Sequence, residues 1–298
     1  MLLENAIEEF TTAKRAAGRS LRTIAKYHDT LLALAQHTDG NLEGVTTGDI
    51  RSYLAGRRDA GHKPASLNTY YRVFATFFHW CAVEYGIPNP MERVERPQVP
   101  KKLPPYLSDE DISKLLNATS QSHCPLRDHA IVLVLVDTGI RAGELINLKM
   151  GDIDLREGEV RVFGKDQEER FVPIDIQATQ ALTRYLDSRR DHGSNRPIFI
   201  SQCTGKALTV SGLRQILKRL ARQAGVEKRV YTHLFRHTFG QRWLANGGDL
   251  ESLRLALGHN QLNTTQIYAG LRIEDVKRKH QQLSPANRLF RATQLPLW

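Results

Sequence analysis

Six residues in the second half of the chain form a set that could do chemistry on a phosphodiester. They comprise two arginines, two histidines, a lysine and a tyrosine: Arg141, Lys165, His233, Arg236, His259 and Tyr268. Each residue alone says little, because an arginine on a helix usually lies at the surface and a tyrosine in an apolar helix usually lies in the core. The combination and its order along the chain are what indicate a function.

The two arginines are the residues expected to hold the phosphate. Arginine is always charged, and its planar guanidinium binds phosphate oxygens through two hydrogen bonds. Arg141 and Arg236 together would neutralise the ground state and offset the extra negative charge of a pentacoordinate transition state. The alternative for Arg141 is structural, since Glu144 lies three residues later and could simply be its ion-pair partner.

The remaining residues offer proton transfer and a nucleophile. His233 lies three residues before Arg236, so both occupy one face of a helix if Thr232 opens it. Its imidazole can hydrogen-bond a phosphate or relay a proton. Lys165, at a hairpin tip, is a candidate general acid for a departing alkoxide. Tyr268 is the candidate nucleophile and would form a phosphotyrosyl ester.

Two other chemistries are disfavoured. His233 and His237 have the spacing of a helical zinc site, but Leu234 stands where metalloprotease chemistry needs glutamate, and no third ligand is evident. No glycine-rich phosphate loop followed by Lys-Ser or Lys-Thr is present, so ATP is not implied. The sequence therefore predicts neither a metal nor any other cofactor.

The charge balance points to a polyanion. The 298 residues include 42 Lys+Arg and 32 Asp+Glu, a formal net charge of +10. Residues 1–105 hold 14 basic and 11 acidic residues (+3), and residues 106–298 hold 28 and 21 (+7). Nucleic acid is the commonest partner of such a protein, although a basic protein that is merely soluble has the same composition.

Cysteine usage and hydropathy predict a cytoplasmic protein without membrane association. Cys81, Cys124 and Cys203 are odd in number and far apart, which suits neither a disulfide framework nor a CxxC metal site. No apolar run approaches the ~18 residues of a membrane span, and the first residues lack the basic-then-apolar order of a signal peptide.

The first hundred residues have the pattern of four helices. Apolar residues recur at helical spacing over 2–17, from Ser20 to about Gln36, around 50–54, and from Pro64 to about Glu84. The last segment is rich in aromatic residues, which we expect to pack in a core rather than stack on bases. Four such helices could form a compact bundle.

A proline-rich connector separates this bundle from the rest of the chain. Residues 96–105 contain Pro97, Pro100, Pro104 and Pro105, which prevent a helix and favour an extended, stiff segment. We therefore predict an N-terminal helical domain over 1–95, a linker over 96–105, a second domain over 106–283 and a tail over 284–298.

The second domain is predicted to be α+β. A buried helix over about 129–137 ends at Thr138-Gly139, and another helix starts near Arg141. Residues 160–162 and 171–174 read as a β-hairpin around Lys165, and further helices start near 177, 210, 232, 250 and 261. A basic stripe on the helix at 210 could contact a DNA backbone or be a solvated face; it consists of Arg214, Lys218 and Arg222.

The second domain resembles the catalytic domain of the tyrosine recombinase (phage integrase) family over about residues 106–282. Four boxes carry the resemblance. They are Thr138-Gly139-Ile140-Arg141-Ala142-Gly143-Glu144-Leu145; Val162-Phe163-Gly164-Lys165 through Arg170-Phe171-Val172-Pro173-Ile174; His233-Leu234-Phe235-Arg236-His237; and Leu257-Gly258-His259 followed by Thr264-Thr265-Gln266-Ile267-Tyr268. The N-terminal bundle resembles the SAM-like core-binding domain of the same family, particularly of Xer-type recombinases.

The resemblance implies strand exchange on a double-stranded DNA recombination site. Tyr268 would form a 3′-phosphotyrosyl link and release a 5′-hydroxyl, and the partner strand's 5′-hydroxyl would then displace the tyrosine. Two rounds would pass through a Holliday junction in a homotetramer or an assembly with a paralogous recombinase. By position, Lys165 would be the general acid, His233 would assist proton transfer and His259 would support the phosphate, while Glu144 would act behind the arginines.

The sequence departs from the family pattern at several positions, and two other functions stay open. Phe235 stands where leucine is commoner, Asp166 where glycine is usual, and Ala269-Gly270 where a polar pair is usual. A tail helix over 273–282 is expected to dock into a neighbouring subunit. The other functions are a DNA-binding relative that has lost catalysis and a type IB topoisomerase-like enzyme that relaxes DNA.

Overall fold

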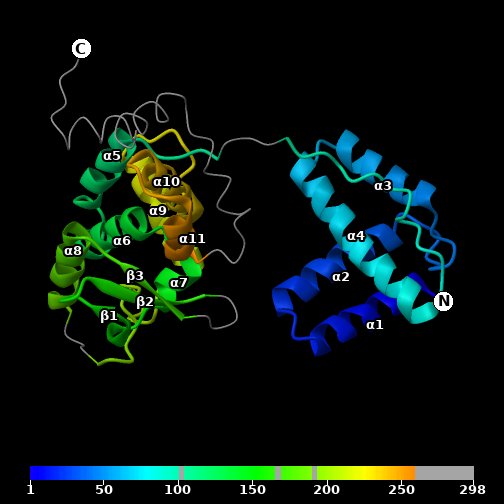
Figure 1. The fold of residues 1–298 in the computed structure, drawn as a ribbon, viewed down its shortest axis with the longest axis horizontal. Helices are drawn as coiled ribbons and strands as arrows, with labels where there is room; N and C mark the ends of the chain where they lie inside the picture. Colours follow the sequence, from blue (N-terminus) through cyan, green and yellow to red (C-terminus); the bar gives the residue numbers. More distant parts are fainter. Residues whose placement is uncertain (101–103, 165–168, 190–192, 259–298) are drawn as a thin grey trace, which may run out of the picture. The chain divides into compact units, whose positions relative to one another are not determined.

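The described part of the chain is mainly α-helical and contains a small β-sheet (Figure 1). The structure, a computed structural model, describes residues 1–100, 104–164, 169–189 and 193–258. The chain divides into two compact units, Met1–Lys102 and Leu103–Trp298, and the division falls inside the proline-rich segment 96–105. The predicted fold class, mainly α with a small sheet or hairpin, is confirmed.

The first unit contains four helices around an aromatic core. Phe10, Phe74, Phe77 and Phe78 are fully buried, and the rings of Phe10 and Phe77 meet edge to face with centroids 5.3 Å apart. The expectation that the aromatic stripe belongs to a core is therefore confirmed. The helices are α1 (Leu3–Ala16), α2 (Leu21–Ala35), α3 (Thr47–Asp59) and α4 (Pro64–Tyr85).

Local sequence signals explain where these helices begin and end. The Ser20 hydroxyl accepts a hydrogen bond from the Thr23 backbone N–H, and Thr46 and Asp49 form a reciprocal capping box at the start of α3. Pro64 occupies the first turn of α4, where its missing N–H costs nothing.

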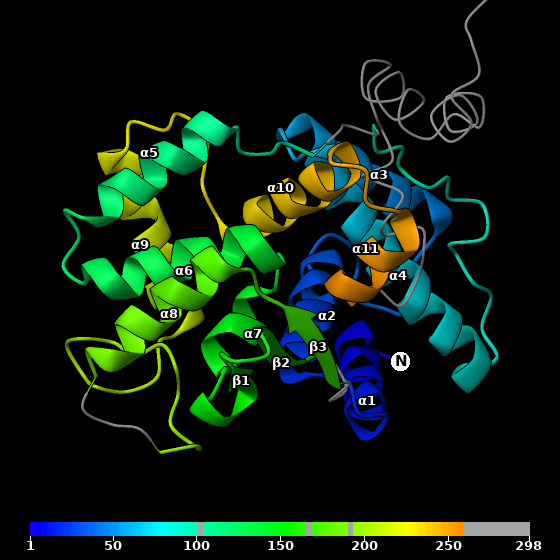
Figure 2. The same ribbon diagram turned by 60° about the vertical axis from the view of Figure 1, so that its left-hand side comes forward.

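The second unit is built around α6. This helix carries fully buried apolar residues, including Ile131, Val132 and Leu135, and it contacts α5, α8 and α10 (Figures 1 and 2). It starts at Pro125 rather than near 129, since a proline in the first turn is compatible with a helix. The helices are α5 (Asp109–Thr119), α6 (Pro125–Thr138), α7 (Ala142–Asn147), α8 (Ile176–Asp187), α9 (Val210–Gln223), α10 (Thr232–Ala245) and α11 (Leu250–Leu257).

The sheet is antiparallel, with strand order β1-β2-β3. It comprises β1 (Ile153–Asp154), β2 (Glu159–Phe163) and β3 (Glu169–Pro173), and β1 follows a short 3-10 helix, η1 (Met150–Asp152). The predicted hairpin is therefore confirmed, whereas the two-residue β1 is too short to leave a periodic signal. Val160 pairs with Val172 and Val162 with Arg170, which places Arg170 on the inward, valine-bearing face.

Among the described residues, no helix is both long enough and apolar enough to cross a membrane. The helix expected near 261, the tail helix over 273–282 and the tail over 284–298 lie outside the described residues.

Candidate active site

Three of the six predicted site residues are described by the structure. Arg141 is the N-cap residue of α7, and His233 and Arg236 lie in the first turns of α10. Lys165, His259 and Tyr268 lie outside the described residues.

A tight turn at Gly139 delivers Arg141 to its position. Gly139 ends α6 with φ +59°, a left-handed conformation that favours glycine. A Cβ at this position would lie 3.0 Å from ring atoms of Phe239 in α10. The chain can therefore reverse against α10 because residue 139 has no side chain, and α7 begins shortly afterwards at Ala142.

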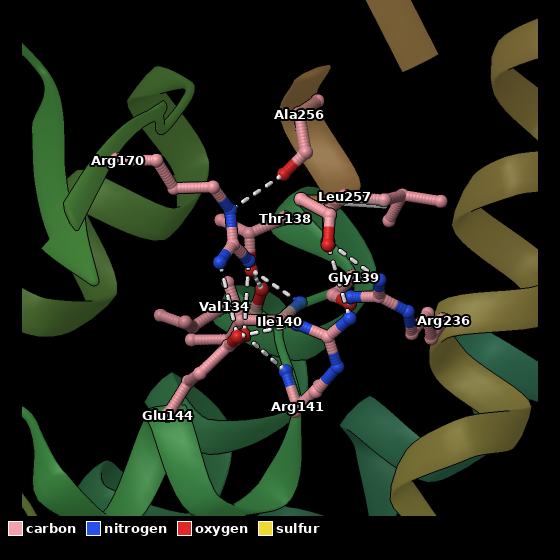
Figure 3. Close-up of polar contacts among 11 residues, drawn as sticks. Val134, Thr138, Gly139, Ile140, Arg141, Glu144, Arg170, Arg236, Ala256 and Leu257 are labelled. Carbon is pink, nitrogen blue, oxygen red and sulfur yellow. Dashed lines mark hydrogen bonds and ion pairs between the residues drawn. The ribbon is translucent and has the colours of Figure 1, made fainter. Parts of the chain in front are cut away.

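Arg141 is bound to Glu144 through both its backbone and its side chain (Figure 3). Its backbone N–H donates to Glu144 Oε2 at 2.8 Å, and its Nη1 donates to Oε1 at 2.7 Å. The Arg141 side chain is 37% exposed, whereas that of Glu144 is 4% exposed. The ion-pair partnership expected as an alternative is thus present, and it leaves part of the Arg141 guanidinium open to solvent.

A second arginine, Arg170 on β3, holds the same carboxylate. Its Nη1 donates to Glu144 Oε1 at 3.0 Å and its Nη2 to Oε2 at 2.9 Å. Burial by itself would raise the pKa of Glu144, but the hydrogen bonds and charges of Arg170 and Arg141 outweigh it and lower this pKa to about 2. Glu144 is therefore a carboxylate at any physiological pH.

Arg170 was not among the residues selected from the sequence, although a signal for it exists. Arg170 lies two residues before Val172 in β3, so both side chains are on the same, inward face of the strand. An arginine on a buried face requires a partner for its charge, because an unpaired buried charge is strongly unfavourable. The inward position of Arg170 could therefore have indicated that it has an acidic or carbonyl partner, but not which residue that partner is.

Arg236 comes from α10 to the same place. It is 2% exposed, and it donates from Nη1 to the Gly139 carbonyl at 3.0 Å and from Nη2 to the Leu257 carbonyl at 2.5 Å. Arg141 donates from Nη2 to the next carbonyl, that of Gly258, at 3.1 Å. Since the two arginines bind consecutive carbonyls at the end of α11, their guanidiniums lie close together (Figure 3).

The electrostatics of this cluster favour an anion. The cluster contains three guanidiniums, those of Arg141, Arg170 and Arg236, and one carboxylate, that of Glu144, which accepts from Arg141 and Arg170. Neutral backbone carbonyls also accept from all three arginines and cancel no charge. A phosphate placed beside the partly exposed Arg141 side chain would lie near two positive charges, those of Arg141 and the buried Arg236. The arrangement therefore fits a phosphodiester.

Burial and the neighbouring arginines lower the pKa of His233, which favours its neutral form. Desolvation of the ring lowers the pKa of His233 below its ordinary value, and the positive charges of Arg236 and Arg141 lower it further. A neutral imidazole can accept a proton as well as donate a hydrogen bond. His233 is therefore suited to proton transfer at the phosphate that the two arginines would bind.

A basic cavity of about 710 Å³ lies next to His233. Its lining includes Arg214, Lys228 and Arg229. Arg214 also belongs to the basic stripe of α9, and all three members of that stripe, Arg214, Lys218 and Arg222, are exposed. Their charges are available to a polyanion beyond the phosphate at the arginine pair.

Comparisons with known proteins agree with this chemistry. The model of the phage integrase family matches residues 105–274. The tyrosine recombinase XerD of Listeria monocytogenes is 35% identical over 272 residues, which cover 88% of this chain and 90% of the relative.

Solved structures show the same fold. The crystal structure of XerA recombinase is 27% identical, covers 94% of this chain and 99% of its own, and has a TM-score of 0.54. The XerH site-specific recombinase bound to a palindromic difH substrate, a post-cleavage complex, is 22% identical, with coverage of 95% and 84% and a TM-score of 0.72.

Proposed function

This chain belongs to the phage integrase family of tyrosine recombinases, and from that premise we propose that it cleaves and rejoins double-stranded DNA at a specific site through a 3′-phosphotyrosyl intermediate. The observation that carries the proposal is the convergence of Arg141 and Arg236 on consecutive carbonyls, near His233, whose pKa their charges lower. The DNA-bound XerH structure, which shares the fold, supports DNA as the substrate.

In the proposed first step, the Tyr268 hydroxyl oxygen attacks the scissile phosphorus. A bond forms between the tyrosyl oxygen and phosphorus while the bond from phosphorus to the 5′ oxygen breaks. Arg141 and Arg236 hold the non-bridging oxygens and offset the charge that develops in the transition state. Lys165 delivers a proton to the departing 5′ oxygen.

The histidines complete the proposed site. His233 assists the proton transfer that accompanies attack, consistent with the lowered pKa of its ring, and His259 supports the phosphate. In the second step the 5′-hydroxyl of the partner strand displaces Tyr268 and restores the phosphodiester. The same groups act in reverse, so the reaction consumes no nucleotide.

The assembly proposed for strand exchange is a tetramer on DNA. Residues 1–95 are proposed to be a core-binding domain, and two rounds of cleavage would pass through a Holliday junction. The tetramer is either homomeric or shared with a paralogous recombinase, and it serves integration, excision or the resolution of chromosome dimers at partition. Because the substrate is DNA, we propose the cytoplasm as its location.

A suicide substrate tests the central step. The wild-type protein, incubated with nicked DNA carrying its recombination site, should accumulate a covalent protein–DNA adduct that denaturing electrophoresis resolves. Tyr268→Phe should bind the same DNA without forming the adduct. A wild type that binds the site but forms no adduct, or a Tyr268→Phe variant that still forms one, would overturn the proposal.

Lys165→Ala separates a catalytic from a binding role. The loss of one transition-state contact typically lowers a rate by ~10²–10³-fold. We expect cleavage by this variant to slow by that range while its dissociation constant for DNA is unchanged. A collapse of DNA affinity would instead make Lys165 a binding residue.

A further inference from the structure

We propose that Arg170 is a positioning residue for the recombinase reaction: it fixes Glu144, and through Glu144 it orients the phosphate-binding guanidinium of Arg141. The proposal rests on the proposed function, because it assigns Arg170 a part in the same cleavage step. The contacts around Glu144 carry it, together with the contact of Arg170 to the end of α11.

The first step concerns what holds the carboxylate. Two of the hydrogen bonds to Glu144 come from Arg141 itself, through its backbone N–H and Nη1. Within the described residues, the contacts to Glu144 that are independent of Arg141 are the paired bonds from Arg170, one to each oxygen. A bidentate pair fixes the plane of a carboxylate as well as its position. Without Arg170, Glu144 would be oriented mainly by the residue that it is meant to orient.

The second step concerns exposure. The side chain of Arg170 is 14% exposed and that of Glu144 is 4% exposed, whereas Arg141 is 37% exposed. The buried pair can therefore act as a rigid support for the partly exposed side chain of Arg141. A partly exposed arginine would otherwise sample many rotamers, and restricting it to one rotamer at the moment of reaction would cost conformational entropy.

The third step links this support to α11. The Nε of Arg170 donates to the Ala256 carbonyl at 3.2 Å. Gly258 ends α11 with φ +60°, and a Cβ there would lie 2.9 Å from Arg170 Nη1, so the Arg170 guanidinium packs closely against the end of this helix. The carbonyls of the neighbouring positions 257 and 258 are those that Arg236 and Arg141 bind. Arg170 thus supports both the carboxylate and the backbone against which the two arginines rest.

A purely structural role explains this arrangement less well. A buried ion pair can often be replaced by apolar residues of similar volume without loss of stability. The cross-strand neighbour of Arg170 is Val162, so an apolar residue would continue the inward face of the sheet. The arginine at position 170 gives Glu144 a second hydrogen-bonding partner that is independent of Arg141, which an apolar residue at 170 would not provide.

The test compares Arg170→Gln and Arg170→Lys with a matched control, Arg127→Gln. Arg127 is also a buried arginine that binds a buried carboxylate, that of Asp128, and it also donates to a backbone carbonyl, that of Ile200. Arg127 lies near the start of α6, whereas the turn at Gly139, which leads to Arg141, lies at the other end of this helix. The 14-residue helix separates the two clusters by roughly 20 Å.

Single-turnover cleavage of the suicide substrate is the main readout, at a temperature where each variant is folded by circular dichroism. Arg170→Gln should cleave about 10–100-fold more slowly, the range seen when an outer partner of a metal-site ligand is removed. Its affinity for DNA should be unchanged. Arg170→Lys keeps one charged donor and should recover part of the rate, and folded Arg127→Gln should cleave like the wild type.

A double variant supplies a readout that a merely structural role would not move. If Arg170 acts through Arg141, the double variant Arg141→Ala, Arg170→Gln should be slowed, relative to the wild type, by far less than the product of the two single fold-changes. Three results would each overturn the proposal. They are a double variant slowed by the full product of the two single fold-changes, a wild-type cleavage rate for Arg170→Gln, and a fall in cleavage rate that matches the fraction of unfolded protein. A wild-type protein without a covalent adduct would instead overturn the proposed function, so the two failures are distinguishable.

Discussion

A carboxylate lies near each end of helix α6, and each of the two carboxylates is bound by two arginines. In its first turn, Asp128 accepts from Arg127 at 2.7 and 2.9 Å and from Arg219 at 3.5 Å. Just beyond its last turn, Glu144 accepts from Arg141 and from Arg170 at distances of 2.7–3.0 Å. In both clusters an arginine also donates to a backbone carbonyl distant in sequence, that of Ile200 or that of Ala256.

The two clusters differ in what they leave exposed. At the first, the side chains of Arg127 and Asp128 are 7% and 0% exposed, so this ion pair is enclosed, and the second partner, Arg219, is 29% exposed. At the second, the Arg141 side chain is 37% exposed, and Arg236 adds a further charge through its bonds to Gly139 and Leu257. We therefore assign a structural role to the enclosed Arg127–Asp128 pair and keep the phosphate-binding role proposed above for the partly exposed Arg141.

The largest effect should come from disrupting the buried ion pair between Arg127 and Asp128, which should lower the stability of the second unit. Arg127→Gln leaves the Asp128 charge buried with one distant partner, and removing one member of a buried ion pair costs about 3–5 kcal/mol. We expect the free energy of unfolding of the second unit to fall by that amount in urea titrations. Cleavage by the folded protein should not change; a slower rate without loss of stability would contradict the structural assignment.

The opposite pattern is expected for Arg141→Ala. Cleavage should slow by about 10²–10³-fold because a charged donor to the transition state is lost. The free energy of unfolding should change by no more than about 1 kcal/mol, since the removed side chain is partly exposed and Glu144 keeps its bonds to Arg170. Arg141→Lys, which keeps the charge without the bidentate geometry, is the control. A fall in the free energy of unfolding as large as that of Arg127→Gln would show that the two clusters do not differ in this way.

The Glu144 cluster should also have a defined dependence of stability on pH. The pKa of Glu144 is lowered in the folded state from 4.5 to about 2, so its ionised form stabilises the fold at pH values above 4.5. This stabilisation should diminish as pH falls from 4.5 towards 2. Denaturation of the wild type and Glu144→Gln across this range measures it. The stability difference between them should shrink on acidification, and a difference independent of pH would contradict the assignment.

The smallest effect should come from Arg219→Gln. Arg219 is the second partner of Asp128, but its contact is 3.5 Å long and its side chain is 29% exposed. Such a pair contributes at most about 1 kcal/mol. We expect a small fall in urea stability and an unchanged cleavage rate. Arg170→Gln, the matched change at the other cluster, should slow cleavage; equal behaviour of the two variants would show that the second partners are equivalent.

Much of the fold follows from local sequence signals. Ser20 and Thr46 cap their helices as their types indicate, and Gly139 ends α6 as expected. The helices expected near 177, 210, 232 and 250 begin at Ile176, Val210, Thr232 and Leu250. These features were predictable because capping and helical periodicity act over a few residues. The domain boundaries and the six site residues remain predictions of the sequence.

The role of Arg170 was not predictable from local pattern alone. Its partners are Glu144 and Ala256, which lie 26 and 86 residues away along the chain. The Arg127–Asp128 pair gives no local sign of its function either, because a neighbouring arginine and aspartate usually form a solvated surface pair. Burial of Asp128 depends on elements that pack around α6 from elsewhere in the chain.

The residue types that can bind a phosphate, their order, and the helices and hairpin that carry them can be read from the amino-acid chain alone. The folded arrangement was needed to show which arginines are buried, that Glu144 binds two arginines, and that Arg141 and Arg236 bind consecutive carbonyls. This is because the effect of a charged side chain depends on its desolvation and its partners. Both are set by packing between segments far apart in the chain.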